Sequence, residues 1–271
     1  MGYLVVASIL LFVPGLAITY LLGLDKYRYL LSFSLSYSLF VLLLTSAPLF
    51  GLDVKSFKFI YFFLIFSLST LAAVKFYRTV TNEKYTSTVK YCSCHSYSKS
   101  VSLFILIIVT GYFLMVGPYV ELPSDIFQHL EYMQNTTREI FLSENTGKPI
   151  AYFLGQNGKY WYYLYSFISI WSGNSLHEAI FPASYFNVSV FLLGFFCFSL
   201  VVFRDMQPSP KILAFTSLAA VFFAFFHFGI NIFSFIRYYA IAPVILNFVL
   251  YFSVMAIIID FYRNSSWNIK Y

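Results

Sequence analysis

The sequence predicts an all-α fold, a polytopic bundle of transmembrane helices. Of the 271 residues, 60% are hydrophobic and only 10% are charged, whereas a soluble domain has about 25% charged residues. Most of the uncharged stretches reach the roughly 20 residues that a helix needs to cross a bilayer. They are continuously apolar rather than alternating, which argues against a transmembrane β-barrel. The stretches free of Asp, Glu, Lys and Arg are residues 1–24, 29–52, 59–74, 100–120, 160–176, 179–203, 212–236 and 238–259.

The distribution of Lys and Arg predicts about seven crossings within a single transmembrane domain, residues 1–271. If residues 160–176 form a re-entrant or interfacial helix while the other stretches cross, eleven Lys and Arg lie on one side and six on the other. If residues 160–176 cross fully, the split becomes eight against nine. Because basic residues concentrate in cytoplasmic loops, the first arrangement is preferred. It places residues 78–99 in the cytoplasm, and the amino terminus and residues 121–159 outside.

The first stretch is expected to remain as a helix rather than to act as a signal peptide. It lacks a basic segment before its apolar run and a small-residue cleavage site. Pro14 and Gly15 lie in its middle. The net charge of +6 is read as an orientation signal, so nucleic acid is not an expected partner.

The outer loop 121–159 contains an amphipathic helix that starts with the sequence LPSDIFQHLEYMQN. Ser124 is a suitable N-cap for a helix that begins at Asp125. At 100° per residue, the apolar arc holds Ile126, Leu130, Met133, Ile140 and Phe141, and the opposite arc holds Asp125, Gln128, His129, Tyr132, Thr136 and Glu139. Asp125 and His129 are one turn apart, close enough to act on one substrate. The alternative is a solvated polar face, with Asp125 favoured only by the helix dipole.

Further candidates follow this helix on the outer side. His177 and Glu178 lie where the re-entrant segment turns back, and are expected to help close a substrate site. Arg237 lies between two apolar stretches, where it either snorkels to phospholipid phosphate or binds the phosphate of a lipid-linked substrate. The aromatic residues at the start of the re-entrant segment are expected at the headgroup level, as an aromatic belt. They are Tyr160, Trp161, Tyr162, Tyr163 and Tyr165.

Cysteines give little reason to expect a metal. Cys92, Cys94 and His95 form a C-S-C-H cluster in the 78–99 loop. Structural zinc normally needs four ligands, with two or more residues between paired cysteines. The cluster is therefore interpreted as a reduced loop without metal.

Several segments together resemble the amino-terminal half of polytopic GT-C-type membrane glycosyltransferases. The resemblance covers roughly residues 1–200 and implies transfer of a sugar from a polyprenyl-phosphate-linked donor to an envelope glycan, lipid or protein acceptor on the outer face. The segments are LLFVPGLAITYLLG, KYRYLLSFSLSYSLFVLLLTSAPLFGL, LPSDIFQHLEYM and YWYYLYSFISIWSG.

Carried over to this sequence, the resemblance makes Asp125 the catalytic acidic residue, with His129 and Glu131 as its neighbours. Arg237 matches the basic residue that such enzymes use on the lipid phosphate. Together with Gln128 and His177 from the outer surface, these residues make up the candidate substrate-binding set. Some family members hold a divalent metal between paired acidic residues. Here only Glu121 and Asp125 are close, with Pro123 between them, so no metal or other cofactor is expected.

Two alternatives stay open. The chain is shorter than typical GT-C enzymes and lacks their soluble domain, which fits a truncated relative, a fragment or a non-catalytic subunit of another membrane protein. A transporter or flippase for lipid-linked glycans, or a polysaccharide-assembly protein, is the other class. Such proteins place charged groups or repeats near the bilayer midplane, whereas His227 is almost the only ionisable group in these spans. Usage rich in Phe, Tyr, Ile, Lys and Asn suggests an AT-rich bacterial genome, and hence the bacterial cytoplasmic membrane.

Overall fold

The chain is helical wherever regular structure is described. The computed structural model describes residues 2–24, 28–82, 102–111, 114, 124–149, 160–202, 212 and 243–264. The named elements are α1 (Gly2–Leu22), α2 (Arg28–Ser46), the 3-10 helix η2 (Ala47–Phe50), α3 (Val54–Asn82), α5 (Ser124–Thr146), α7 (Tyr160–Ser172), α8 (Leu176–Val202) and α11 (Pro243–Asn264). One isolated antiparallel bridge joins Asp53 to Pro149.

Five helices in the described part are long and apolar enough to cross a membrane. They confirm the predicted class, an all-α protein of multi-pass membrane type, and each overlaps an uncharged stretch of the sequence. Of the expected crossing at 100–120, the described residues include a short apolar helix, Ser102–Gly111. The expected crossing at 212–236 lies outside them, apart from residue 212. The candidate spans are Gly2–Leu22, Arg28–Phe50, Val54–Thr79, Glu178–Val202 and Leu246–Arg263.

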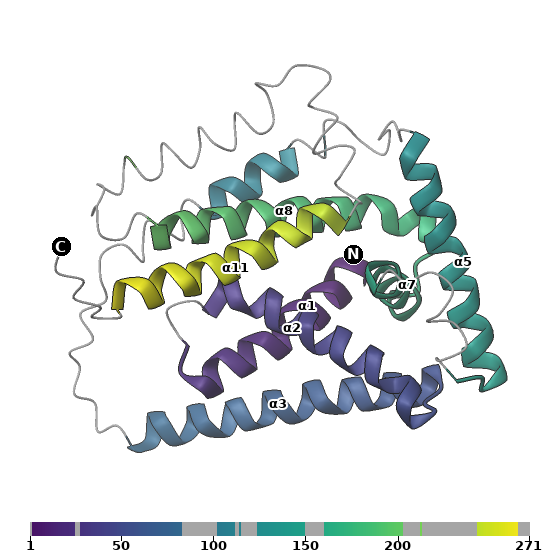
Figure 1. Ribbon diagram of the computed structural model, residues 1–271, viewed down its shortest axis with the longest axis horizontal. Coiled ribbons are helices and arrows are strands. Elements are labelled where there is room, and N and C mark those ends of the chain that lie inside the picture. The colour runs from purple at the N-terminus through teal and green to yellow at the C-terminus, as the bar shows by residue number, and fades with distance from the viewer. Residues whose placement is uncertain are drawn as a thin grey trace.

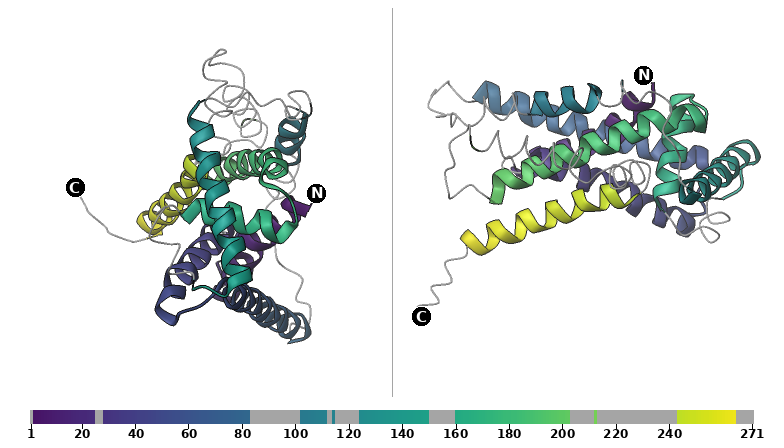
Figure 2. Two further views of the ribbon diagram at one scale, coloured as in Figure 1. Left: turned by 90° about the vertical axis from the view of Figure 1, so that its right-hand side faces the viewer. Right: turned by 90° about the horizontal axis from the view of Figure 1, so that it is seen from above.

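The long helices lie side by side, and two others lie across one end of them. In Figure 1, α3, α8 and α11 extend along the long axis of the molecule, while α5 runs down the right-hand edge and α7 is seen end-on. The left view of Figure 2 shows α5 crossing in front of the bundle. At 13 residues, α7 is about 20 Å long, shorter than the roughly 30 Å of a hydrocarbon core. Its length sets it apart from the five candidate spans.

The crossing of α1, α2 and α3 is built around Pro14. A proline has no N–H, so it leaves the carbonyl of residue i−4 unpaired. That carbonyl, on Leu10, accepts a hydrogen bond of 3.2 Å from the Tyr61 hydroxyl of α3. The backbone N–H of Gly15 donates to the Ser36 hydroxyl of α2 at 2.8 Å. Both neighbouring helices thus satisfy backbone groups at the proline.

The carboxy-terminal helix α11 joins the bundle through α2 and α8. The Ser253 hydroxyl lies 2.6 Å from that of Ser34, and donates to the Leu30 carbonyl at 3.1 Å. Phe252 stacks on Phe198 of α8, with ring centroids 5.2 Å apart. Polar contacts of this kind hold apolar helices together where the surrounding lipid offers little hydrophobic driving force.

Candidate functional site

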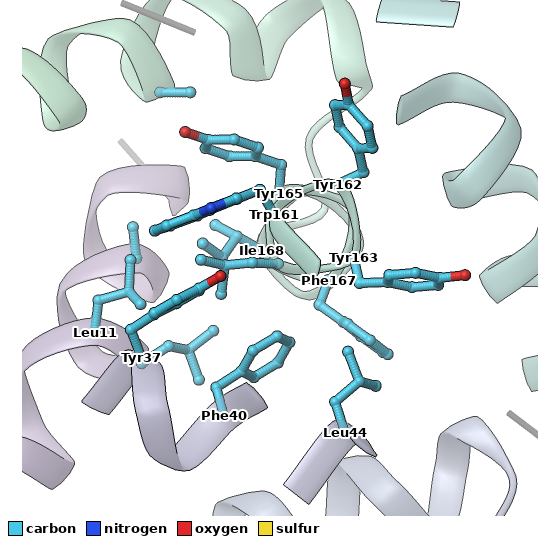
Figure 3. Close-up of a cluster of buried hydrophobic side chains, with 14 of the residues drawn as sticks. Leu11, Tyr37, Phe40, Leu44, Trp161, Tyr162, Tyr163, Tyr165, Phe167 and Ile168 are labelled. Atoms are coloured by element: carbon cyan, nitrogen blue, oxygen red, sulfur yellow. The ribbon is translucent and has the colours of Figure 1, made fainter. Parts of the chain in front are cut away.

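Helix α7 is the centre of the end of the bundle that α5 covers. All nine residues from Trp161 to Ser169 are buried. Figure 3 shows the aromatic side chains among them, and Ile168, radiating from α7 toward the neighbouring helices. Trp161 stacks on Tyr37 of α2 with a centroid distance of 3.9 Å, and the Tyr165 hydroxyl accepts a 2.6 Å hydrogen bond from the Asn187 amide of α8. A helix that is buried on every side belongs to a core.

The expected aromatic belt is therefore wrong for four of its five residues. Trp161, Tyr162, Tyr163 and Tyr165 are no more than 7% exposed, and Tyr160 is partly buried. The surrounding helices provide a stacking partner for Trp161 and Tyr162 and a hydrogen-bond donor, Asn187, for the Tyr165 hydroxyl, in place of the headgroup region. Composition alone does not separate an interfacial aromatic cluster from a buried one, because both combine an apolar ring with a polar tip that needs a partner.

Helix α5 packs on α7 through polar side chains. Thr137 donates from its hydroxyl to the Ser166 hydroxyl at 2.9 Å, and Ser166 donates to the Met133 carbonyl at 3.3 Å. The rings of Tyr132 and Tyr162 stack at 5.8 Å. The sequence places residues 125, 129, 132, 136, 139 and 143 along one stripe of α5, at alternating intervals of four and three.

Much of this polar stripe is turned inward, which corrects the interpretation of a purely solvated polar face. Thr136 and Ser143 are completely buried. Of the predicted apolar arc, Met133 and Ile140 are buried in the bundle, whereas Phe141 is exposed. The buried arc is rotated toward the polar stripe, because α7 offers hydroxyls and aromatic rings that the polar residues of α5 can contact.

Glu139 is the residue of this stripe that the sequence-based candidate set missed. Its Oε2 atom is hidden from solvent and has no hydrogen-bond partner within the described part of the chain. Burial raises the pKa of the Glu139 carboxyl above its ordinary value. On α7, burial and then the nearby Glu139 carboxyl raise the pKa of Tyr163 to about 12. A desolvated carboxyl with a perturbed pKa is a candidate functional group.

Glu139 was detectable in principle, because it lies on the same stripe as Asp125. Nothing in the sequence of α5 indicates that a carboxyl oxygen at this end of the stripe is hidden from solvent. That depends on α7, which follows α5 only after the intervening residues 147–159.

The carboxyl end of α5 is fixed to the start of α3. Ser143 donates from its hydroxyl to the Lys148 carbonyl at 2.5 Å, and the next residue pairs with Asp53 in the isolated bridge. Lys58 and Glu144 form an ion pair at 3.9 Å. Asp53 also caps α3, accepting the Ser56 N–H at 2.7 Å, and these hydrogen bonds lower the pKa of its carboxyl. These contacts hold α5 in place across the end of the bundle.

The sequence-predicted site residues are only partly placed. Asp125, Gln128 and His129 lie in the first two turns of α5, and their side chains are outside the described part of the structure. Glu131 is exposed and lies off the polar stripe. His177 is in the first turn of α8, and its side chain is also outside the described part of the structure. Arg237 lies outside the described residues, as do Cys92, Cys94 and His95.

Glu178, expected beside His177 to close the site, has a local structural role. The Ser175 N–H donates to Glu178 Oε2 at 2.8 Å, and the Glu178 N–H donates to the Ser175 hydroxyl at 3.3 Å. This reciprocal pair is a capping box at the start of α8. Across the described residues, no group of three or more His, Cys, Asp and Glu side chains is placed to hold a metal ion.

The fold defines the class of this chain, an all-helical protein of multi-pass membrane type with a polar and aromatic layer at one end. Comparison with protein-family models, with curated proteins and with solved structures finds no match to the chain. The function is therefore inferred from the α5–α7 layer itself, which offers carboxyls, hydroxyls and aromatic rings in one place.

Proposed function

We propose that the chain is a membrane glycosyltransferase that moves a sugar from a polyprenyl-phosphate-linked donor to a glycan, lipid or protein acceptor. The observation that carries the proposal is the polar stripe of α5, which runs from Asp125 past Thr136 and Glu139 and packs on an aromatic helix. Carboxyls and hydroxyls hydrogen-bond sugar hydroxyls, and aromatic rings offer apolar faces to the ring.

In this proposal Asp125 is the general base. Its carboxylate takes the proton of the acceptor hydroxyl as that oxygen forms a bond to the anomeric carbon of the donor. The bond from the anomeric carbon to the phosphate oxygen breaks, and its electron pair leaves on the lipid phosphate. Arg237 stabilises this departing phosphate. Gln128, His129, Glu131 and His177 bind or orient the substrates.

Glu139 serves a different part of the substrate. It lies 14 positions after Asp125, which is about 21 Å along a helix at 1.5 Å per residue. One monosaccharide does not reach both carboxyls, whereas an elongated acceptor does. We therefore assign Asp125 to the reacting centre and Glu139 to a remote acceptor hydroxyl, reached when the packing around its hidden oxygen opens.

The proposed location is the bacterial cytoplasmic membrane, with the α5–α7 layer outside. In support, the arrangement preferred from the sequence places eleven Lys and Arg on the side away from α5 and six on the side of α5. Basic residues favour the cytoplasmic side.

The test is sugar transfer in membranes supplied with radiolabelled polyprenyl-phosphate sugars. Asp125→Asn is compared with wild type and with Glu144→Gln, a carboxyl of the same helix engaged in a surface ion pair. We expect the rate of sugar transfer by Asp125→Asn to fall about 100-fold or more, as for loss of a general base. Glu144→Gln is expected to transfer sugar at nearly the wild-type rate. Equal transfer in all three proteins would remove Asp125 from the mechanism. Donor movement across the membrane without transfer would favour the flippase class instead.

A further inference from the structure

The end of the bundle opposite α5 carries a cluster of cations around one tyrosine. The Lys75 ammonium lies 5.5 Å from the centre of the Tyr20 ring, and the Arg28 guanidinium lies 5.3 Å from the same ring. These three residues come from α3, α2 and α1, so the cluster joins three helices. Cations at such distances from an aromatic face are held by its quadrupole.

The cluster also caps a helix. Lys75 Nζ donates to the carbonyls of Tyr20 and Leu21 at 3.1 and 2.9 Å. These carbonyls belong to the last turn of α1, which ends at Leu22, and Gly23 follows with a φ of 71°. A cation placed here complements the negative end of the helix dipole. The cap fixes the position of the Lys75 charge.

Exposed aromatic side chains surround these cations. Tyr29, Phe76 and Tyr77 are all more than half exposed, and Phe76 lies 6.3 Å from Tyr20 between ring centroids. Arg78 lies three residues after Lys75, at the polar end of the candidate span Val54–Thr79. Aromatic residues and cations together at the end of an apolar helix are typical of the headgroup level of a bilayer.

We propose that Arg28, Lys75 and Arg78 form a binding site for the phosphate of an acidic phospholipid at the end of α1. A guanidinium donates several hydrogen bonds to phosphate oxygens, and the fixed Lys75 charge adds attraction in the low dielectric of the interface. The exposed aromatic rings lie against the acyl chains next to the headgroup. This site is at the opposite end of the helices from the α5–α7 layer, and it is independent of sugar transfer.

The experiment uses the full chain in phosphatidylcholine nanodiscs, with phosphatidylglycerol added in increasing amounts and bound lipid counted by native mass spectrometry. Arg28→Gln combined with Arg78→Gln is compared with wild type. The matched control is Lys55→Gln combined with Lys148→Gln, which removes two exposed cations at the α5 end. Lys75 is left intact, so that the cap of α1 is kept. Thermal unfolding in phosphatidylcholine alone verifies that both variants are folded.

Each cation near an anionic surface contributes about fivefold to lipid affinity. We therefore expect phosphatidylglycerol to bind the double variant between about fivefold and about 25-fold more weakly than wild type, and the control to bind like wild type. Arg28→Lys with Arg78→Lys is expected to recover most of the affinity. Equal binding by wild type and the glutamine variant, or an equal loss in the control, would overturn the proposal.

Inorganic phosphate separates a lipid site from a site for free phosphate. Added at the same concentration as the lipid, it is expected to leave phosphatidylglycerol binding unchanged, because it gains nothing from the acyl-chain contacts. Displacement of the lipid by inorganic phosphate would assign the cluster to a soluble anion and overturn the lipid assignment.

Discussion

The Tyr61 hydroxyl donates a hydrogen bond to the Leu10 carbonyl, the group that Pro14 leaves without an intrahelical partner. Tyr61 is completely buried, and the two residues are 51 positions apart in the chain. An unpaired carbonyl within a membrane is unfavourable, so this contact makes the proline tolerable in α1. It also fixes where α3 crosses α1.

Tyr61→Phe is expected to lower the free energy of unfolding by about 0.5–1.5 kcal/mol, the range for one lost hydrogen bond. Unfolding in detergent measures the change. Tyr251→Phe is the control, because Tyr251 is exposed. In a Pro14→Ala background, residue 14 regains an N–H for the Leu10 carbonyl, so the effect of Tyr61→Phe should shrink in a double-mutant cycle. An equal effect in both backgrounds would show that the Leu10 carbonyl is not the partner that matters.

Gly15→Ala is expected to disrupt the α1–α2 crossing. An added Cβ would lie 1.9 Å from the Ser32 carbonyl oxygen, so the backbones must separate. Overpacking typically costs about 1–3 kcal/mol, and occasionally more. Gly111→Ala is the matched control, because no atom of the described residues lies within 4 Å of a Cβ there, and alanine favours a helix by about 1 kcal/mol. The unfolding temperatures of the two variants should shift in opposite directions relative to wild type. Equal shifts would contradict the close approach of the α1 and α2 backbones at Gly15.

Glu139→Gln is expected to change the pH dependence of stability. Because the folded-state pKa of Glu139 is raised, the native state holds its proton more tightly than the unfolded chain. Its contribution is fully present below the ordinary pKa of 4.5, and is lost as pH rises through the folded pKa. Glu139→Gln should therefore gain stability relative to wild type as pH rises through this window.

Denaturant unfolding at a series of pH values measures this difference. Glu144→Gln on the same helix serves as the control and should not reproduce the trend. A difference between wild type and Glu139→Gln that stays constant with pH would mean that the carboxyl of Glu139 is not desolvated in the folded protein.

Asp53→Ala is expected to cost about 1 kcal/mol through loss of the α3 cap. Hydrogen bonds from Ser56 lower the pKa of Asp53, so its contribution is present above the ordinary pKa of 3.8 and is lost as pH falls through the folded pKa. The difference in the free energy of unfolding between Asp53→Ala and wild type should therefore disappear in acid. Lys55→Ala, two residues into the same helix, is the comparison, and a deficit that persists in acid would contradict the cap.

The sequence identified the helices because their signal is local. Uncharged stretches mark the five candidate spans, and Ser124 marks the start of α5, which the structure reproduces. The length of an uncharged stretch does not predict the length of its helix, because the shortest stretch, residues 59–74, lies in the 29-residue α3, whereas residues 160–176 contain the 13-residue α7.

What the sequence by itself determined is the all-helical class, the apolar segments that the five candidate spans overlap, and the polar stripe on α5. Only the tertiary structure decided that residues 161–169 of α7 are buried, that Thr136 is inside and Phe141 outside, and that one carboxyl oxygen of Glu139 is hidden from solvent. Periodicity defines the faces of a helix, but burial depends on what a distant segment supplies. Thr137 and Ser166, 29 residues apart, satisfy one another only once α5 and α7 have packed together.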